Sequence, residues 1–244
     1  MDRVIYLAMT GAKQVAEQQA TTAHNLANLN TTGFRAQMDS FRAVPVQGPS
    51  LPTRAYVLDA TTGSDFTQGT VQETGHALDV AVRGAGWIAL QQPDGTEAYT
   101  RDGKLRLNEN GVLTGAQGMA VASETGAITA PTDARLSVAA DGTISAIDTQ
   151  GKASALARIK LVNPPSQALV RGDDGLFRLR SGEAADADAT VQVQSGLLEG
   201  SNVNAIDAMV SLISQSRSFE LQMSLLKNAE NNDAKAGQIL QMNT

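Results

Sequence analysis

Cysteine is absent from all 244 residues, which excludes disulfide frameworks, thiolate metal sites and cysteine nucleophiles. Aromatic residues make up only 4% of the chain and Trp87 is its single tryptophan, so a large aromatic-lined ligand pocket is not expected. The formal net charge is −6, which gives no electrostatic footprint for nucleic acid. The apolar runs are too short to span a bilayer. We therefore expect neither a nucleic-acid partner nor direct membrane insertion.

The N-terminus lacks the pattern of a secretory signal. Met1-Asp2-Arg3 carries one acid and one base, and the apolar run that follows, Val4 to Met9, is short. A cleaved leader has a more basic start and a longer apolar core. We expect the first residues to belong to the mature protein, so that export would need another route.

Chemistry-bearing clusters are also missing. The only histidines are His24 and His76, and neither has partners at the spacing that a metal site or a triad needs. Arg83–Trp87 contains a bare G-x-G, which indicates a bend between strands rather than a nucleotide loop. Tyr99–Gly103 falls where a hairpin turn is expected, and Asp186 with Asp188 indicates a solvated loop. We expect no enzyme, no cofactor, no metal and no catalytic residues.

Residues 1 to about 30 have the pattern of an amphipathic helix. Apolar and small residues recur at steps of three and four, close to a heptad repeat. These positions are Ile5, Ala8, Ala12, Val15, Leu26 and Leu29. Alanines flank the stripe, so the helix buries little area by itself and needs a partner. Asn28–Gly33 collects poor helix formers and ends the helix on a glycine.

A second amphipathic helix is predicted from residue 203 to about 240. Ser201–Asn204 supplies capping side chains just before the apolar period begins. The predicted packing positions are Ile206, Met209, Leu212, Ile213, Phe219, Met223 and Leu226. The pattern fits a core helix of one globule, or a helix that pairs with residues 5–29 in an antiparallel coiled coil.

The middle of the chain has the pattern of antiparallel β-structure. Short β-suited runs alternate with dipeptides that favour tight turns. The dipeptides are Asp94-Gly95, Asp102-Gly103, Asn110-Gly111, Asp141-Gly142 and Asp174-Gly175. We therefore predict an α+β protein with a discontinuous two-helix coiled-coil domain from 1–35 and 203–244, an extended connector at 36–74 and a β-rich domain at 75–202.

Several segments resemble the signature blocks of bacterial flagellar rod and hook proteins, in the same order along nearly the whole chain. The blocks are Ala23–Arg35, Leu78–Trp87, Ala98–Gly103 with Leu107-Asn108, and Glu199–Asn204. His24 and Trp87 depart from the family's usual Asn and Phe. The matching motif residues at the two helix ends are Asn25, Leu26, Ala27, Asn28, Thr31, Gly33, Phe34, Ser201, Asn202, Val203 and Asn204.

The resemblance implies a structural axial subunit of the flagellar basal-body rod whose terminal helices pair, line a hollow shaft and polymerise. It implies other copies of the chain, other rod proteins and the flagellar type III export apparatus as partners, and a periplasmic location without a cleaved signal peptide. The opening residues Met1–Tyr6 and Met9–Lys13, with the short connector, are most similar to proximal-rod members. The alternatives are a distal-rod or hook paralogue, or a soluble β-rich binding module.

Overall fold

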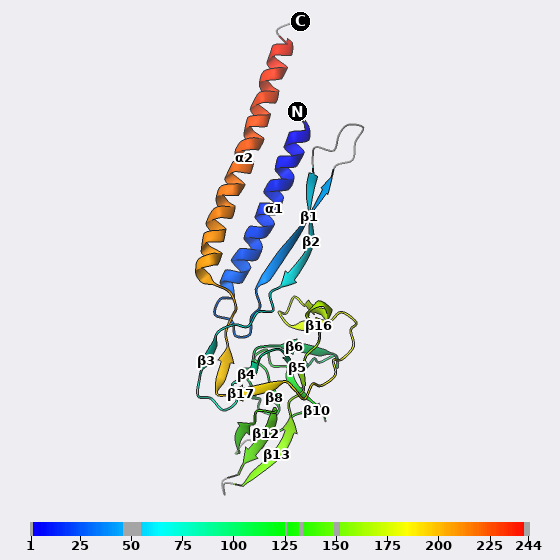
Figure 1. Ribbon diagram of the computed structural model, residues 1–244, viewed down its shortest axis with the longest axis vertical. Coiled ribbons are helices and arrows are strands. Elements are labelled where there is room, and N and C mark those ends of the chain that lie inside the picture. The colour runs from blue at the N-terminus through cyan, green and yellow to red at the C-terminus, as the bar shows by residue number, and fades with distance from the viewer. Residues whose placement is uncertain (1, 46–54, 125, 132–133, 149–151, 242–244) are drawn as a thin grey trace. The chain divides into compact units, whose positions relative to one another are not determined.

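The computed structural model describes residues 2–45, 55–124, 126–131, 134–148 and 152–241 (Figure 1). The chain divides into two compact units, each built from segments that are distant in sequence. The helical unit comprises Met1–Asn28, Ala36–Asp65 and Val203–Thr244, and the β-unit comprises Leu29–Arg35 and Phe66–Asn202. The predicted α+β class, with a helix near each end and antiparallel strands between them, is confirmed.

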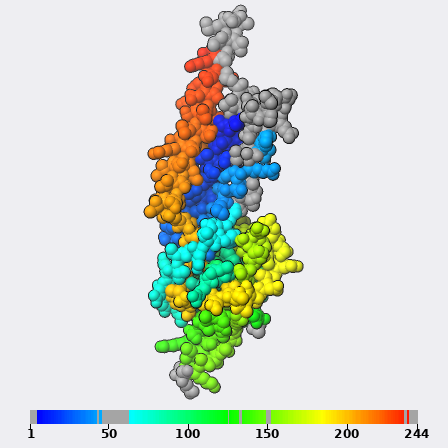
Figure 2. All heavy atoms as spheres, viewed as in Figure 1, coloured from blue at the N-terminus to red at the C-terminus, as the bar shows by residue number. Residues whose placement is uncertain are grey.

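Two antiparallel helices lie side by side in the helical unit, α1 (Asp2–Ala27) and α2 (Ala205–Gln241) (Figures 1 and 2). The side-chain amide of Gln215 donates a hydrogen bond of 3.1 Å to the Thr22 hydroxyl. A Cβ placed on Gly11 would lie 3.1 Å from the Gln222 side chain, so small residues on α1 allow a close approach. No helix in the described part of the chain is both long enough and apolar enough to cross a membrane.

A strand pair completes the helical unit. β1 (Gln37–Pro45) and β2 (Ala55–Ser64) run antiparallel, with Gln37 opposite Ser64 and a register shift after Ser40. The segment predicted as an extended connector, 36–74, contains both of these strands. The prolines and hydroxyl residues suggested a linker, but Phe41 to Val44 and Tyr56 to Leu58 are β-branched or aromatic enough to form strands. Pro49 and Pro52 lie outside the described residues.

The β-unit holds the remaining strands, all paired antiparallel. The largest sheet follows the order β15 (Leu169–Arg171), β16 (Phe177–Leu179), β6 (Glu97–Thr100), β5 (Trp87–Gln91), β9 (Ala120–Ser123), β8 (Leu113–Thr114) and β7 (Arg106–Leu107), with β10 (Gly126–Ala127) on β9 and β14 (Leu161–Val162) on β5. A three-stranded sheet orders β11 (Arg135–Val138), β12 (Thr143–Ile147) and β13 (Ala153–Arg158). Two further pairs join β4 (Val80–Arg83) to β17 (Gln192–Ser195) and β3 (Val71–Glu73) to β18 (Leu197–Glu199). A short 3₁₀ turn occupies Ser166–Ala168.

Two apolar clusters form the core of the β-unit. The larger is aliphatic and includes the fully buried Ile88, Leu113 and Ile144. The smaller contains the rings of Trp87 and Phe177, whose centroids are 4.7 Å apart. Trp87, Tyr99 and Phe177 are buried in this smaller cluster, and Phe66 packs against it.

Four of the five predicted turn dipeptides place a glycine at positive φ: Gly95, Gly111, Gly142 and Gly175. Gly84 and Gly86 also take positive φ in the predicted bend between β4 and β5. The fifth prediction, a hairpin turn at Asp102-Gly103, is wrong. Gly103 instead accepts a hydrogen bond from the Val80 amide at 3.0 Å, and a Cβ on Gly103 would lie 1.6 Å from the Val80 carbonyl oxygen. Glycine is needed there for a close crossing of two segments.

Candidate functional site

The motif residue Asn25 fixes the chain where it leaves α1. Its side-chain amide donates to the carbonyl of Gln37 at 2.9 Å, and its side-chain oxygen accepts from the Gln37 amide at 2.8 Å. One asparagine therefore satisfies both backbone groups of the first residue of β1. Asn28 donates from its side chain to the carbonyl of His24 at 2.9 Å, which satisfies one of the last carbonyls of α1.

Gly33 lies so close to the backbone of the β-unit that a side chain at this position would clash. Its φ is +67°, and an added Cβ would lie 2.3 Å from the Asp102 nitrogen and 2.4 Å from the Arg101 carbonyl carbon. The Gly33 amide donates to the Glu199 carbonyl at 2.7 Å. Glycine is needed here for two reasons, the positive φ and the close contact with neighbouring backbone.

A buried ionic cluster follows immediately. Arg35 donates from Nη2 to Glu199 Oε1 at 2.6 Å, and Arg101 donates from Nη1 to Glu199 Oε2 at 3.0 Å. The side chains of Arg35 and Glu199 are 0% exposed and that of Arg101 is 5% exposed. The Gly69 amide also donates to Glu199 Oε1 at 2.9 Å. One carboxylate therefore joins three segments of the β-unit, those carrying Arg35, Gly69 and Arg101.

The cluster carries two cations and one anion, so it depends strongly on its single carboxylate. Burial lowers the pKa of Arg101, and the charge of Glu199 opposes this shift. The Arg101 guanidinium gains further acceptors in the carbonyls of Val82 and Gly84. Arg35 Nε and Nη1 have no hydrogen-bond partner among the described residues. A buried charge without an opposite charge beside it destabilises the folded state. Glu199 is the only anion in this cluster, so both buried guanidinium groups depend on it.

Two more contacts hold the N-terminal motif to the β-unit. The Arg171 guanidinium lies 4.4 Å from the centre of the Phe34 ring and donates to the carbonyl of Arg35 at 2.9 Å. Burial lowers the pKa of Arg171. The Thr32 hydroxyl donates to Asp102 Oδ1 at 2.7 Å. Residues 32–35 thus form part of the β-unit, whereas the predicted domain boundary placed them with the helices.

The C-terminal motif lies beside the N-terminal one. The Asn202 amide donates to the Phe34 carbonyl at 3.4 Å, and its side chain donates to the Thr67 carbonyl at 3.1 Å. Ser201 is buried. Further along the chain, the Asn204 side chain accepts from the Ile206 amide at 3.0 Å, which makes it the N-cap of α2.

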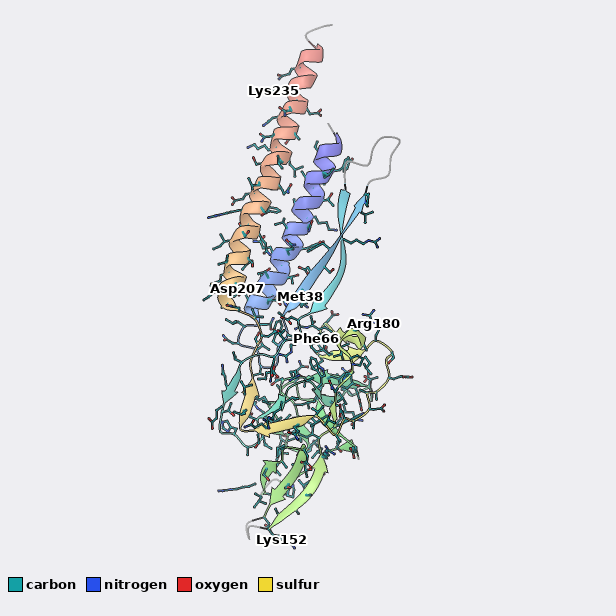
Figure 3. All side chains as sticks on the ribbon, in the orientation of Figure 1. Met38, Phe66, Lys152, Arg180, Asp207 and Lys235 are labelled. Carbon is teal, nitrogen blue, oxygen red and sulfur yellow. The ribbon has the colours of Figure 1, made fainter. Side chains whose placement is uncertain are left out.

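The predicted packing positions divide into two sets. Ala8 and Ala12 are buried on α1, and Ile5, Val15, Leu26 and Leu29 are half-buried. On α2, Leu212, Phe219 and Leu226 are half-buried, whereas Ile206, Met209, Ile213 and Met223 are exposed. Figure 3 marks Asp207 in the first turn of α2, among these exposed apolar residues. The structure therefore brings only part of the predicted stripe against α1.

The ionic cluster itself was not among the predicted site residues. Arg35 is the last residue of the motif block Ala23–Arg35, and Glu199 is the first residue of the block Glu199–Asn204. Their opposite charges at these two positions were the only sequence feature that pointed to the pair. Arg101 was set aside because its segment was assigned to a hairpin turn. No group of three or more histidine or acidic residues in the described chain could hold a metal ion.

The sequence matches three family descriptions. Residues 5–35 match "Flagella basal body rod protein", residues 81–146 match "Flagellar hook protein FlgE/F/G D1 domain", and residues 194–239 match "Flagellar basal body rod FlgEFG protein C-terminal". A flagellar basal-body rod protein FlgF of Escherichia coli is 47% identical over 99% of this chain and 100% of its own length. The chain belongs to the flagellar basal-body rod protein family.

Other rod proteins of the family are similar along their whole length. FlgF of Salmonella typhimurium is 44% identical over 99% of this chain and 100% of its own length. FlgG of Bacillus subtilis is 30% identical over 94% of this chain and 96% of its own length. Membership of this family makes the chain a structural rod protein rather than an enzyme.

Proposed function

We propose that the chain is an axial subunit of the proximal rod and that it polymerises through its terminal helices. The similarity to FlgF over nearly the full length supports the proximal assignment, because the FlgG relative is less similar. In this proposal α1 and α2 form an antiparallel coiled coil within each subunit, and the predicted packing residues serve both this pair and the contacts between subunits.

The observation that carries the proposal is the apolar surface on α2 that α1 leaves uncovered. Ile206 is 72% exposed, Val210 61% and Ile213 57%. These residues recur at steps of three and four, so they share one face of the helix. Ala208 and Leu212, which are buried and half-buried, lie on a different face.

α1 also carries large apolar side chains that α2 does not cover. Tyr6 is 60% exposed and Met9 is 53% exposed on a helix whose Ala8 and Ala12 are buried. Contiguous exposed apolar patches mark interaction sites, and a subunit that uses different patches for its two neighbours can build an open helical assembly. The two-faced helices therefore favour a filament subunit over a self-contained globule.

The proposed partners are other copies of the chain and neighbouring proximal and distal rod proteins. The proposal includes delivery by the flagellar type III export apparatus and a periplasmic position in the rod. A distal-rod or hook paralogue is the second candidate, because residues 81–146 match a domain shared with hook proteins and the FlgG relative covers most of the chain.

The test is Ile213→Asp in the full-length chain, expressed in a strain that lacks its own copy. The side chain is exposed, so the monomer is expected to unfold at the same denaturant concentration as the wild type, while rods fail to form and the cells do not swim. Ser211→Asp adds the same charge at an exposed polar position on another face of α2 and is the matched control. Motile cells carrying Ile213→Asp would overturn the proposal.

The axial position is tested separately. We expect deletion of the gene to remove the distal rod and the hook while leaving the structures that precede the proximal rod. Persistence of a complete rod without a hook would favour the hook paralogue.

A further inference from the structure

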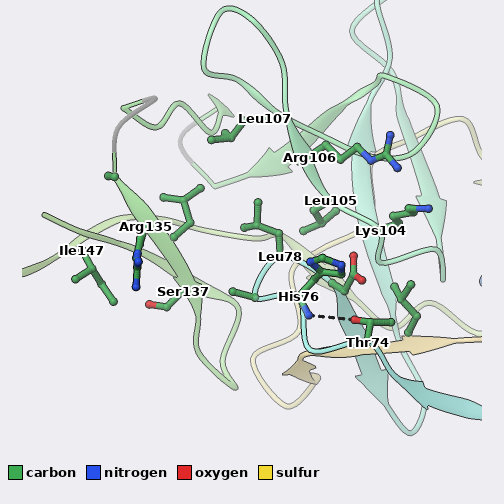
Figure 4. A pocket seen from close by; sticks show the side chains of 15 residues that line it. Thr74, His76, Leu78, Lys104, Leu105, Arg106, Leu107, Arg135, Ser137 and Ile147 are labelled. Atoms are coloured by element: carbon green, nitrogen blue, oxygen red, sulfur yellow. Dashed lines mark hydrogen bonds between the residues drawn. The ribbon is translucent and has the colours of Figure 1, made fainter. Parts of the chain in front are cut away.

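A pocket in the β-unit lies where the aliphatic core reaches the surface. Its volume is about 1220 Å³ (Figure 4). Leu105 and Leu136 in its wall are buried core residues, while Leu78 and Leu107 are only partly buried. The pocket therefore exposes a side of the core that the β-unit does not cover.

The rim of this pocket is positively charged. Lys104, Arg106 and Arg135 line it, together with the exposed His76, and Asp79 is the one carboxylate among its lining residues. None of the three cations forms an ion pair within the described chain. Three cations against one carboxylate leave the pocket locally positive in a protein with a net charge of −6, which indicates an acidic occupant.

The size and walls of the pocket favour a chain segment over a small molecule. Small-molecule pockets measure about 300–1,000 Å³, and this pocket is larger. β7 contributes Arg106 and Leu107, and β11 contributes Arg135 to Ser137. Each of these strands is at the edge of its own sheet. Edge strands offer unpaired backbone groups to an incoming segment.

An acidic loop on the same unit has the complementary charge. No lysine or arginine occurs between Arg180 and Arg217, and Glu183 and Asp186 are exposed and form no ion pair with any residue that the structure describes. The backbone is bound within the loop and just after it, because the Ala185 amide donates to the Tyr99 hydroxyl at 2.7 Å and the Asp188 amide donates to the Leu161 carbonyl at 2.8 Å. The two free carboxylates therefore project from a fixed backbone.

We propose that the basic pocket receives the acidic loop Glu183–Asp186 of a second copy of this chain. β3, which leads into the pocket, and β16, which leads into the loop, lie on opposite sides of the β-unit (Figure 1), and Arg180 marks the start of the loop segment in Figure 3. The Ala185 amide is bound to Tyr99, and none of residues 183–188 lines the pocket of its own subunit. A contact between two different surfaces can repeat along an open helical assembly, and this inference rests on the proposed assembly of the chain into a rod.

The experiment uses single charge reversals in the full-length chain, in a strain without its own copy. Lys104→Glu and Glu183→Lys each place like charges in the contact, and we expect each to lower the amount of the chain in purified basal bodies roughly tenfold. The double variant Lys104→Glu/Glu183→Lys restores opposite charges and is expected to regain incorporation. Lys152→Glu reverses an exposed charge that does not line the pocket and is the control.

A crosslink gives an independent readout. Because the chain has no cysteine, Lys104→Cys together with Glu183→Cys is expected, after addition of a mild thiol oxidant, to form a disulfide between copies in assembled rods and none within the monomer. Normal incorporation of both charge variants, with assembly still abolished by Ile213→Asp, would overturn the loop contact and leave the proposed function intact. Loss with Lys104→Glu but not with Glu183→Lys would also overturn it, because the pocket would then take another acidic partner.

Discussion

Arg35 and Glu199 are 164 positions apart in the sequence and form an ion pair of 2.6 Å inside the β-unit. The pair sets the carboxylate between two guanidinium groups, since Arg101 approaches Glu199 at 3.0 Å. Removing the shared anion leaves two buried cations facing each other, whereas removing one cation leaves a balanced pair. The three residues are therefore expected to differ in their effect on stability.

Glu199→Gln is expected to lower the free energy of unfolding of the β-unit by about 3–5 kcal/mol, as does removal of one partner from other buried pairs. Trp87 is the only tryptophan and lies in the core of this unit, so its fluorescence during urea unfolding measures the effect. The control is Asp174→Asn, which breaks the partly exposed pair with Arg178 and is expected to cost about 0–1 kcal/mol. Equal effects of the two variants would contradict the shared-anion role.

Arg35→Met is expected to destabilise the β-unit less than Glu199→Gln does. The variant keeps the pair between Arg101 and Glu199, and it also removes Nε and Nη1 of Arg35, which have no partner among the described residues. Replacing buried charge by an apolar side chain of similar volume is often close to neutral. The same fluorescence titration measures the difference, and a larger loss for Arg35→Met would contradict it.

Gly33→Ala is expected to be far more damaging than Gly75→Ala. Both glycines have positive φ, +67° and +71°, so alanine pays about 1–2 kcal/mol of backbone strain at either position. A Cβ on Gly33 also meets the backbone of Arg101 and Asp102, while nothing lies within 4 Å of one on Gly75. The difference between their unfolding midpoints measures the close contact alone. Similar midpoints would show that the Gly33 segment can move aside.

Local patterns predicted the elements of this fold, and contacts between distant residues decided the rest. Heptad spacing was enough to find α1 and α2, but spacing cannot show which face of α2 meets α1 and which stays exposed. Asp102-Gly103 has the sequence of a turn, yet the crossing with Val80 determines its conformation. The pairing of Arg35 with Glu199 has no local signal, because the two residues are 164 positions apart in the sequence.

Tyr99→Phe is expected to change how stability depends on alkaline pH. Burial raises the pKa of Tyr99 to about 12, from 10.0. Between these values the unfolded chain loses a proton that the folded chain keeps, so stabilisation present below pH 10 is lost as the pH rises through about 12. At pH 7 the variant is expected to be less stable by about 1–3 kcal/mol, because the Ala185 amide loses its acceptor. The stability difference should shrink from pH 10 to 12 in urea titrations, and a constant difference would contradict this account.

Trypsin should distinguish the two parts of the N-terminal segment. The Lys13 side chain is 76% exposed, so cleavage after it is expected early. The Arg35 side chain is 0% exposed and bound to Glu199, so cleavage after it is expected only when the β-unit opens. Mass spectrometry of timed digests should show a resistant fragment that keeps residues 29–35, rather than one that begins at 36.

Glu199→Gln provides the decisive comparison for this digest. The substitution releases the Arg35 guanidinium without changing any trypsin site, so cleavage after Arg35 should become much faster while cleavage after Lys13 keeps its rate. Fast cleavage after Arg35 in the wild-type chain would mean that the motif segment is not held by the β-unit in solution. Unchanged protection of Arg35 in the variant would instead assign the hold to the Phe34 contact with Arg171 and the hydrogen bond of Thr32 to Asp102.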